Sequence, residues 1–505
     1  MLDLVAGFSS KNDNKFNDEL LCGIRDKDDM VSYIDESCRA VAKLIPENIK
    51  YLGHTEIDNR KRMLERDALD KDPKGGKKAK NEVRINISYS YAKEVSFNFE
   101  LHFGGQVMNT NFTLWIPLLI DNAHFFIRGN KYSAPIQIVD AISYTQKNML
   151  VLKTLTRALK YERSKCIISD IYGEKYNVEK ICILITKKPI PLLVYFFAAY
   201  GFFNTIKFFG ADDFIKVYSG DITESIPKNK YLFKFGNNLC LGVDKEEFDT
   251  NRVLRTFVGT IIASTKRTMD MDYIRNPVRW LGYLGETISP PKALEKGQSL
   301  LKTFINTLDT ATIRNIHDLV DGETRDNMFK VARWIFINYT QMCSKDDGLQ
   351  NKRLRLNEYL ISPFTKIFVD KVHRFMNTPD KIKTINTLQD IFKIKSSIIL
   401  NAIIGKINPQ VTGLNIQKYS SESSDDTLVN VRLVSTKGGP GSPLEKTKRV
   451  GIKHREFSID SLGNLDIIAG TSASAPGIAR YICPMCDTYN PEKKIFEIDP
   501  NLIVM

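Results

Sequence analysis

The feature that most constrains the fold is a change of hydrophobic period near Val83. Upstream, residues 1–84 carry apolar side chains at helical spacing in a polar background, followed by a charged run. Downstream, INISYSY (85–91) and VSFNFELHF (95–103) alternate apolar and polar residues, which is the period of half-buried β-strands. We therefore expect a helical N-terminal region over 1–84 and β-sheet after it.

The rest of the chain mixes the two periods, which predicts an α+β, multidomain protein. Further strands are expected at 113–120, 124–130, 182–186 and 231–235. Helices are expected near 295–308, 326–342 and 355–375. A chain of 505 residues is too long for one compact core, so roughly three domains are expected.

The longest apolar stretch, 190–203, is interrupted by Pro191 and Gly201. A bilayer span needs about 20 apolar residues, so we expect a buried element instead. Pro191 fits the first turn of a helix, and Gly201 fits its C-terminal cap. The opening MLDLVAGFSSKNDNKF has no signal-peptide pattern, and the eight cysteines are sparse. We therefore expect a cytosolic protein with reduced thiols.

The net charge is strongly positive. Lys and Arg number 72 against 59 Asp and Glu, which gives +13 and a pI near 9.1. Such an excess favours a polyanionic partner, most simply nucleic acid. An ordinary solvated surface explains the same excess, and charge alone does not separate the two.

Two small motifs have the spacing of metal sites. Asp270 and Asp272 form a D-x-D that suits an oxygen-ligand site in nucleotide-sugar transferases, but it needs a third ligand and a nucleotide fold. Cys483 and Cys486 have the spacing of half a zinc site, yet no second pair follows them. Structural roles are favoured for both motifs. A zinc site shared with a partner chain stays open.

Two apolar segments predict a hairpin and a helix. IPLLIDNAHFFIRGNKYSAPIQ (116–137) is typical of two strands joined by a tight turn, where Gly129 supplies the positive φ. KKPIPLLVYFFAAYGFF (187–203) is typical of a buried helix. Each pattern on its own is common in globular proteins.

Two basic segments follow. In DGLQNKRLRLNEYLISPFTKIFVDKVHRFM (347–376), cations on an extended segment precede a long amphipathic helix. We favour carboxylate partners within the protein over phosphates for Arg353 and Arg355. The segment 431–480 sets Gly and Pro runs beside Lys and Arg, as required where backbone passes close to nucleic acid. A charged surface loop would have the same composition.

Taken in order, these four segments resemble the N-terminal half of the β subunit of cellular RNA polymerases. In the first segment Asn130-Lys131 stands at the family's turn. The matching residues are Pro117, Phe126, Ile127, Gly129, Gln137, Asn351, Lys352, Arg353, Leu354, Arg355, Glu358, Arg432, Ser435, Gly439, Pro440, Gly441, Arg449, Gly451, Arg455, Gly463, Pro476 and Ile478. Two departures concern the fork: GTSASAPGI (470–478) lacks the family's acidic residues, and Ser458 replaces a His.

The family's metal-binding loop, which belongs to β′, is absent from this sequence. The chain also ends soon after the fork-like segment, before the family's C-terminal half of β. This arrangement resembles the split β subunit of giant (jumbo) phage polymerases. The resemblance therefore implies the N-terminal β polypeptide of a multisubunit, DNA-directed RNA polymerase.

The resemblance implies an α+β fold with protrusion-like, lobe-like and fork-like modules. The implied parts are an N-terminal helical region (1–84), a protrusion-like domain in two parts (85–150 and 347–405), a lobe-like domain (151–346), a fork-like module (406–482) and a tail contacting the complementary β polypeptide (483–505). Such a chain forms one jaw of the DNA cleft and the fork near the active site. No activity is expected from the isolated chain.

The implied partners are a complementary C-terminal β polypeptide, β′ polypeptides, the DNA template and the RNA–DNA hybrid. A promoter-recognition subunit stays open, and no membrane is implied. The catalytic Mg²⁺ would be bound by the β′ partner and not by this chain. The implied location is the host cytoplasm, with packaging in the virion left open. The residues expected near nucleic acid are Arg432, Lys437, Lys446, Lys448, Arg449, Arg455 and Arg480.

Two other functions fit parts of the sequence. A non-enzymatic, sequence-independent nucleic-acid-binding protein explains the charge but not the ordered motifs. A D-x-D transferase would require activity from the isolated chain.

Overall fold

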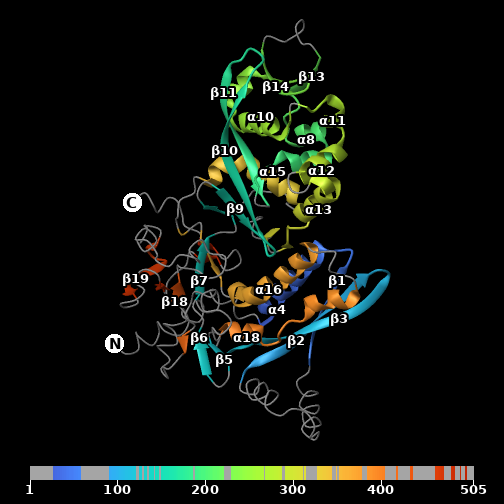
Figure 1. Ribbon diagram of the computed structural model, residues 1–505. Helices are drawn as coiled ribbons and strands as arrows, with labels where there is room; N and C mark the ends of the chain where they lie inside the picture. Colours follow the sequence, from blue (N-terminus) through green and yellow to red (C-terminus); the bar gives the residue numbers. More distant parts are fainter. Residues whose placement is uncertain are drawn as a thin grey trace. The chain divides into compact units, whose positions relative to one another are not determined.

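The computed structural model is a mixture of helices and sheets, drawn as a ribbon in Figure 1. The residues that it describes are 27–57, 90–120, 124–127, 130–133, 136–140, 143–146, 149–185, 188–220, 229–266, 268–286, 290–310, 312–313, 327–343, 349, 352–355, 357–377, 384–403, 417–418, 433–435, 461–470, 479–483, 489–490 and 495–496. Among the helices in these ranges, none is long and apolar enough to cross a membrane.

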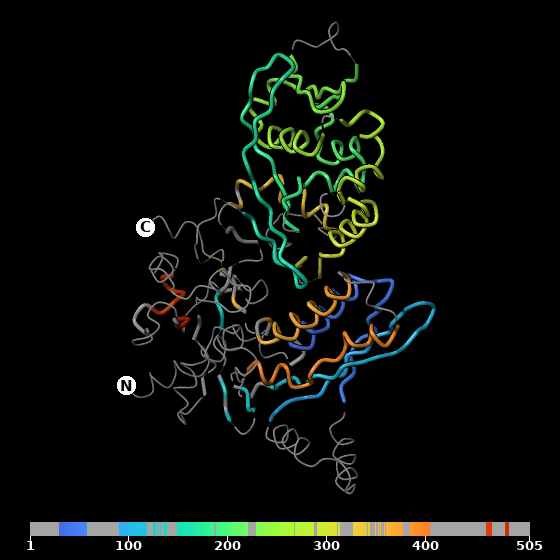
Figure 2. Tube along the Cα trace, in the orientation of Figure 1, coloured from blue at the N-terminus to red at the C-terminus, as the bar shows by residue number. Residues whose placement is uncertain are grey.

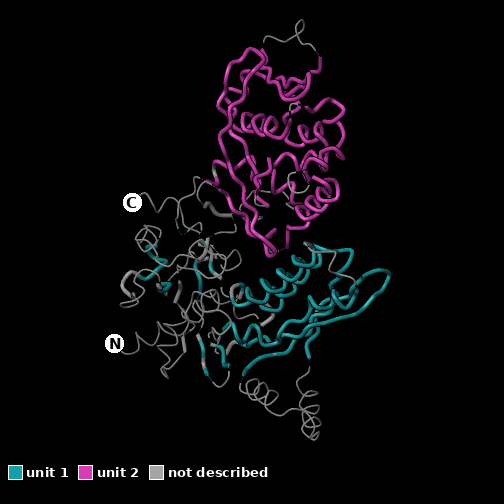
Figure 3. The backbone as a smooth tube through the Cα atoms, in the orientation of Figure 1, with its two compact units in different colours: residues 1–141, 346–505 teal, residues 142–345 magenta. Residues whose placement is uncertain are grey.

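The chain divides into two compact units, coloured separately in Figure 3. Residues 142–345 form the inserted unit, and residues 1–141 and 346–505 together form the outer unit. One cluster of buried apolar side chains lies wholly within 150–342, and a second draws only on the outer unit. The expected lobe-like domain was placed at 151–346, and its identity as a lobe stays a prediction.

The outer unit contains a three-stranded antiparallel sheet in the order β1-β2-β3. Its strands are β1 (Ile49–Glu56), β2 (Ala92–Phe103) and β3 (Gln106–Pro117). The expected alternation is confirmed in β2, where Val95, Phe97, Phe99 and Leu101 are buried. A helical region over 1–84 was only partly right, because β1 follows the helix α4 (Lys27–Leu44). The strand forms because residues Ile49 to Glu56 pair with β2. The local sequence pattern, from which the helix was predicted, carries no information on this distant pairing.

Helices cover the apolar face of this sheet. In Figures 1 and 2, α4 and α16 (Asn357–Asn377) run side by side, although they are far apart in the sequence. The short elements α17 (Ile385–Gln389), η4 (Asp390–Phe392) and α18 (Ile398–Ile403) complete the layer. Phe112 on β3 stacks with Phe97 and contacts rings from α16 and η4, so aromatic packing joins the two segments of the unit.

A small antiparallel sheet contains the expected hairpin. Its strands, in the order β17-β6-β5-β4, are β17 (Gln417–Lys418), β6 (Asn130–Ser133), β5 (His124–Ile127) and β4 (Leu119–Ile120). Ile127 pairs with Asn130, and Phe126 pairs with Lys131. The expectation that Asn130-Lys131 forms the turn was therefore wrong, because both residues belong to the second strand.

The inserted unit has a five-stranded sheet in the order β12-β11-β10-β9-β8. The strands are β8 (Ser143–Gln146), β9 (Met149–Lys153), β10 (Ala158–Ser169), β11 (Lys175–Leu184) and β12 (Ile190–Pro191). The long hairpin of β10 and β11 is plain in Figure 1. Pro191 lies in β12 and not in the first turn of a helix, because Ile190 and Pro191 pair with β11.

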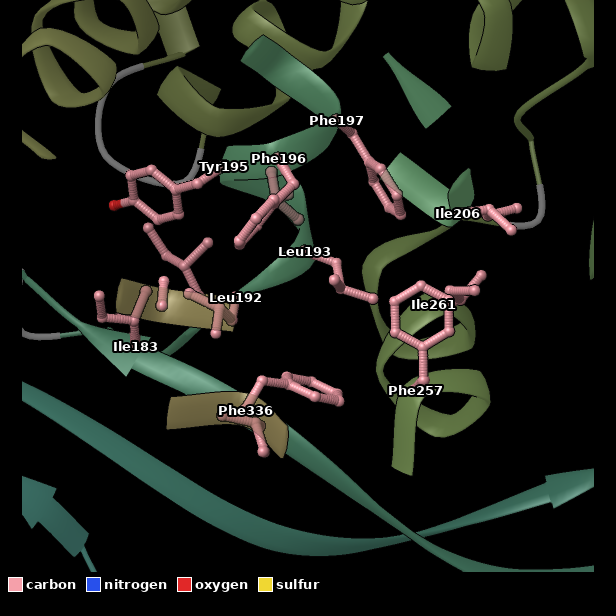
Figure 4. Packing of buried hydrophobic residues seen from close by; sticks show 14 of the residues in the cluster. Ile183, Leu192, Leu193, Tyr195, Phe196, Phe197, Ile206, Phe257, Ile261 and Phe336 are labelled. Carbon is pink, nitrogen blue, oxygen red and sulfur yellow. The ribbon is translucent and has the colours of Figure 1, made fainter. Parts of the chain in front are cut away.

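The apolar stretch 190–203 is buried from Leu192 to Ala198, whereas Phe203 at its end is exposed, and it contains α7 (Leu193–Tyr200) and the start of α8 (Phe202–Phe208). Figure 4 shows Leu193 near Ile261 and Phe257 of α10 (Arg252–Ser264), and Phe196 and Phe197 belong to the same buried cluster. Gly201 caps α7 with φ 83°, and its N–H donates to the Phe197 carbonyl at 3.0 Å. The predicted cap is confirmed.

The remaining elements of the inserted unit are a three-stranded sheet and further helices. The sheet has the order β13-β15-β14, from β13 (Ile215–Ser219), β15 (Leu239–Asp244) and β14 (Lys230–Gly236). The helical elements are α9 (Lys245–Thr250), α11 (Met271–Arg275), α12 (Pro277–Glu286), η1 (Pro290–Lys292), α13 (Ala293–Ile305) and α15 (Met328–Cys343). The expected helices near 295–308 and 326–342 correspond to α13 and α15.

Candidate nucleic-acid interface

A seven-stranded sheet in the outer unit joins segments that are far apart in the sequence. Its order is β19-β20-β18-β7-β16-β22-β21. The strands are β7 (Ile136–Asp140), β16 (Lys352–Arg355), β18 (Leu433–Ser435), β19 (Leu465–Gly470), β20 (Ala479–Ile482), β21 (Tyr489–Asn490) and β22 (Ile495–Phe496). Three of the four segments that resemble a polymerase β subunit therefore contribute neighbouring strands.

Strand β7 lies at the centre of this sheet, between β16 and β18. Strand β7 pairs antiparallel with β16, and Val139 lies opposite Arg353. On its other side β7 pairs in parallel with β18, and Gln137 lies opposite Ser435. Because Ile136, Gln137 and Ile138 are all buried, β7 is covered on both faces. The extended conformation expected for the cations at 352–355 is confirmed.

Most of the basic residues of segment 431–480 lie in the sequence next to or between the strands β18 and β19 of this sheet. Strand β18 ends at Ser435, and the next described residues begin at Ser461, just before β19. In the sequence, Arg432 directly precedes β18, and Lys437 closely follows it. These two residues lie outside the described part of the chain, as do the other expected contacts Lys446, Lys448, Arg449 and Arg455. Their assignment to nucleic acid stays a prediction.

Arg480 is the expected contact residue that the structure describes. It lies on β20 opposite Val434, and it is only 5% exposed. Burial lowers the pKa of its guanidinium below the usual value, although an arginine remains charged at neutral pH. A guanidinium that is buried and has an interaction within the described protein is less accessible to nucleic acid, which favours a structural role for Arg480.

The first residue of the D-x-D motif, Asp270, has a structural role. Asp270 caps the N-terminus of α11, where its carboxylate accepts a hydrogen bond from the Tyr273 N–H at 2.7 Å. Its Oδ1 also lies 3.6 Å from a nitrogen of Arg279. Within the described ranges, no group of three or more His, Cys, Asp or Glu side chains is arranged to hold a metal ion. The geometry therefore favours capping over metal binding.

The other half-motif is described only in part. Cys483 is half-buried, and its backbone N–H donates to the Asn464 carbonyl at 2.9 Å. Cys486 lies outside the described residues. A zinc site shared with a partner chain stays a prediction.

A second basic surface, not expected from the sequence, lies on the sheet β13-β15-β14. Lys216 shares a row of this sheet with Gly242 and Leu232, and Tyr218 shares a row with Cys240 and Lys234. Lys230 lies opposite Asp244. Residues in one row, or two apart on one strand, project on the same side of a sheet. We call the surface formed by Lys216, Tyr218, Lys230 and Lys234 the lysine face.

The opposite side of the same sheet faces the core. Leu241 and Phe233 are fully buried there, and Val217 packs against them. The period-two positions of Lys216 and Tyr218 in IKVYS, and of Lys230 and Lys234 in KYLFKFG, were the available signal. That signal identifies one face only when the two strands are known to share a sheet.

Comparison with known proteins gives a match to one family over nearly the whole chain. The model of a family described as "Non-virion RNA polymerase subunit" matches residues 5–504. The chain belongs to this family of non-virion RNA polymerase subunits. No curated protein matches the chain.

As a non-virion RNA polymerase subunit, the chain works with other polymerase subunits and with nucleic acid. This confirms the expected class of protein. A non-virion polymerase acts in the infected host cell, which decides between the two settings left open by the sequence. The transferase hypothesis loses its support, because Asp270 is a helix cap and the family is a polymerase family.

Proposed function

We propose that this subunit is the N-terminal β polypeptide of a phage multisubunit, DNA-directed RNA polymerase. It would form one jaw of the DNA cleft and the fork next to the active site. The catalytic Mg²⁺ would lie on the β′ partner, so the subunit would contribute to nucleotidyl transfer without performing it alone.

The observation that supports this proposal most directly is the seven-stranded sheet. Segments 116–137, 347–376 and 431–480 were matched to a β subunit on sequence alone. The second provides β16, the third provides β18, β19 and β20, and the last two residues of the first, Ile136 and Gln137, begin β7 between β16 and β18. Chance matches to unrelated local patterns have no reason to become hydrogen-bonded neighbours across about 300 residues of sequence.

The modules of the proposal follow the two units. The inserted unit would be lobe-like, and the sheet β1-β2-β3 with its helices would belong to the protrusion-like domain. The fork-like module would run from about 406 to 482 and would be anchored by β18, β19 and β20. The tail, 483–505, would contact the complementary C-terminal β polypeptide.

The composition of the enzyme tests the subunit assignment. Native mass spectrometry of polymerase purified through a tag on this chain should find a second β-like polypeptide and β′-like polypeptides. Reconstitution with Mg²⁺, nucleotides and template should make RNA only when these partners are present. RNA synthesis by the isolated chain, or a polymerase with an intact β subunit beside this chain, would contradict the proposal.

The fork assignment is tested by charge removal. In the assembled enzyme, replacing Lys446, Lys448 and Arg449 together with Gln should reduce the slope of log affinity against log salt by about 2 to 3 units on duplex template. The reduction should be similar on every template sequence, because phosphate contacts position without reading bases. A control triple variant, Lys207→Gln with Lys292→Gln and Lys296→Gln, removes the same charge from helical elements of the inserted unit. An unchanged slope, or loosened assembly alone, would exclude these three residues from the nucleic acid.

A further inference from the structure

The lysine face is built around the ring of Tyr218, which lies against a glycine of the neighbouring strand. A Cβ atom added to Gly242 would lie 2.4 Å from Cε2 of Tyr218 and 3.3 Å from Cδ2 of Leu232. The ring therefore lies against the Gly242 backbone, and only glycine leaves room for it there. The Tyr218 side chain is half-buried and keeps part of its surface accessible. An accessible aromatic ring offers a base a surface on which to stack.

The charge around this ring is positive. Lys216 and Lys234 are exposed, and Lys230 is half-buried. Burial and then the neighbouring charge of Lys216 lower the pKa of Lys230, while Asp244 opposes this effect. Within the described part of the chain, none of these three lysines forms an ion pair. Lys216 and Lys234 carry their charges on the exposed side of the sheet.

The one acidic residue on these three strands also caps a helix. Asp244 caps α9, and its carboxylate accepts from the N–H groups of Glu246 and Glu247 at 3.2 and 3.4 Å. Asn229 donates to the same carboxylate at 3.4 Å. Asp244 also acts on Lys230, which lies opposite it, and it is one carboxylate against three lysines on this face.

We propose that the lysine face binds a single nucleic-acid strand, with the lysines on phosphates and the Tyr218 ring stacked on a base. The combination of phosphate-neutralising cations with an accessible aromatic ring suits single strands, whose bases are free to stack. A duplex offers phosphates but not free base faces. The site rests on membership of a polymerase family and not on the split-β assignment. It lies in the inserted unit, apart in sequence from the fork-like residues.

The phosphate contacts are tested on the full-length chain with a fluorescein-labelled 20-nucleotide oligo(dT). Replacing Lys216, Lys230 and Lys234 together with Gln should reduce the salt slope of binding by about 2 units, at about 0.7 per phosphate on single strands. The control triple variant at Lys207, Lys292 and Lys296 should keep the wild-type slope. An unchanged slope in the first variant overturns the proposal. Weaker assembly with the other subunits at an unchanged slope also overturns it, because the face then contacts protein.

The stacking contact is tested by Tyr218→Leu and Tyr218→Phe. The leucine variant should bind oligo(dT) roughly tenfold more weakly, and the phenylalanine variant should bind as the wild type does. Circular dichroism and thermal melting check that both variants are folded. A matching duplex of the same length should show little change with Tyr218→Leu, and an equal loss on duplex overturns the single-strand assignment. Equal weakening by both substitutions overturns stacking, because the ring is kept in Tyr218→Phe.

The two proposals fail separately. A lower slope for the lysine-face variant with an unchanged slope for the fork variant at Lys446, Lys448 and Arg449 supports this inference and contradicts the fork assignment. The reverse result contradicts this inference alone.

Discussion

The two units differ in how far along the sequence their partners lie. In the inserted unit every core residue falls within 150–342, and β9, β10 and β11 are consecutive antiparallel strands. In the outer unit, β7 pairs with strands that begin at Lys352 and Leu433. Closing such long loops costs conformational entropy that local contacts do not incur. The outer unit therefore depends on packing that joins its two segments.

Charge is also divided unequally. The inserted unit has 30 Lys and Arg against 21 Asp and Glu, whereas the outer unit has 42 against 38. Most of the net charge therefore belongs to the inserted unit, although the sequence motifs directed attention to the fork-like segment of the outer unit. The lysine face lies in the more basic unit, outside the segments to which the motifs pointed, so motif matching alone missed it.

The largest expected effect tests whether each core is independent. Phe112 is 4% exposed and packs with Phe97, Phe364 and Phe368, with ring centroids 5.4 to 5.5 Å apart. Phe112→Ala should cost about 4 kcal/mol, because it removes a buried ring that joins β3 to α16. Hydrogen exchange by mass spectrometry should show lost protection in β1–β3 and α16, with the inserted unit unchanged.

Phe112→Leu is the matched control, because it keeps most of the buried volume and should cost less than Phe112→Ala. Equal loss of protection in the inserted unit would mean that the two cores unfold together. In that case the inserted unit would not be more independent in stability than the outer unit, although its core is built from one continuous segment.

Sequence reasoning succeeded where the signal was local. The helices α13, α15 and α16 and the alternation in β2 were predicted, because side-chain period is set by the element itself. Strand β1 was missed because its support comes from pairing with β2, some 40 residues away in sequence. The seven-stranded sheet could not be predicted as a sheet, since strands of two to six residues offer too few positions for a period.

The candidate sites follow the same rule. Gly201 was predicted as a cap because its role depends on the adjacent helix. Arg480 was expected near nucleic acid, but it is buried on a strand whose neighbour β18 lies more than 40 residues upstream in the sequence. The lysine face requires residues from β13 and β14 to be placed on one sheet, which composition and spacing do not establish.

The second prediction concerns close helix packing inside the inserted unit. A Cβ on Gly285 would lie 1.7 Å from the Ala293 carbonyl oxygen and 2.7 Å from the Gly297 nitrogen. Both atoms belong to backbone, so α12 and α13 would have to separate. We expect Gly285→Ala to cost about 3 kcal/mol, by urea denaturation, with exchange protection lost in the inserted unit only.

Gly282→Ala is the control for that substitution. It lies on the same helix, and a Cβ there would meet nothing within 4 Å. Alanine in a helix interior is favoured over glycine by about 0.5 to 1 kcal/mol, so this variant should be neutral or slightly more stable. If Gly285→Ala were equally harmless, α12 and α13 would not pack as closely at Gly285 as the distances to Ala293 and Gly297 indicate.

The smallest effect expected is at Gly201, between α7 and α8. Its φ of 83° and ψ of 163° lie in a region that is essentially restricted to glycine. A Cβ there would meet only Pro277 Cγ at 3.6 Å, which is an ordinary contact, so the cost of substitution is conformational. Gly201→Ala should lower the free energy of unfolding of the inserted unit by about 1 to 2 kcal/mol.

Asn tolerates the left-handed helical region but not this one, so Gly201→Asn should cost as much as Gly201→Ala. Urea denaturation of both variants decides the point, because recovery of most of the stability by Asn would mean that this backbone adopts an ordinary left-handed cap.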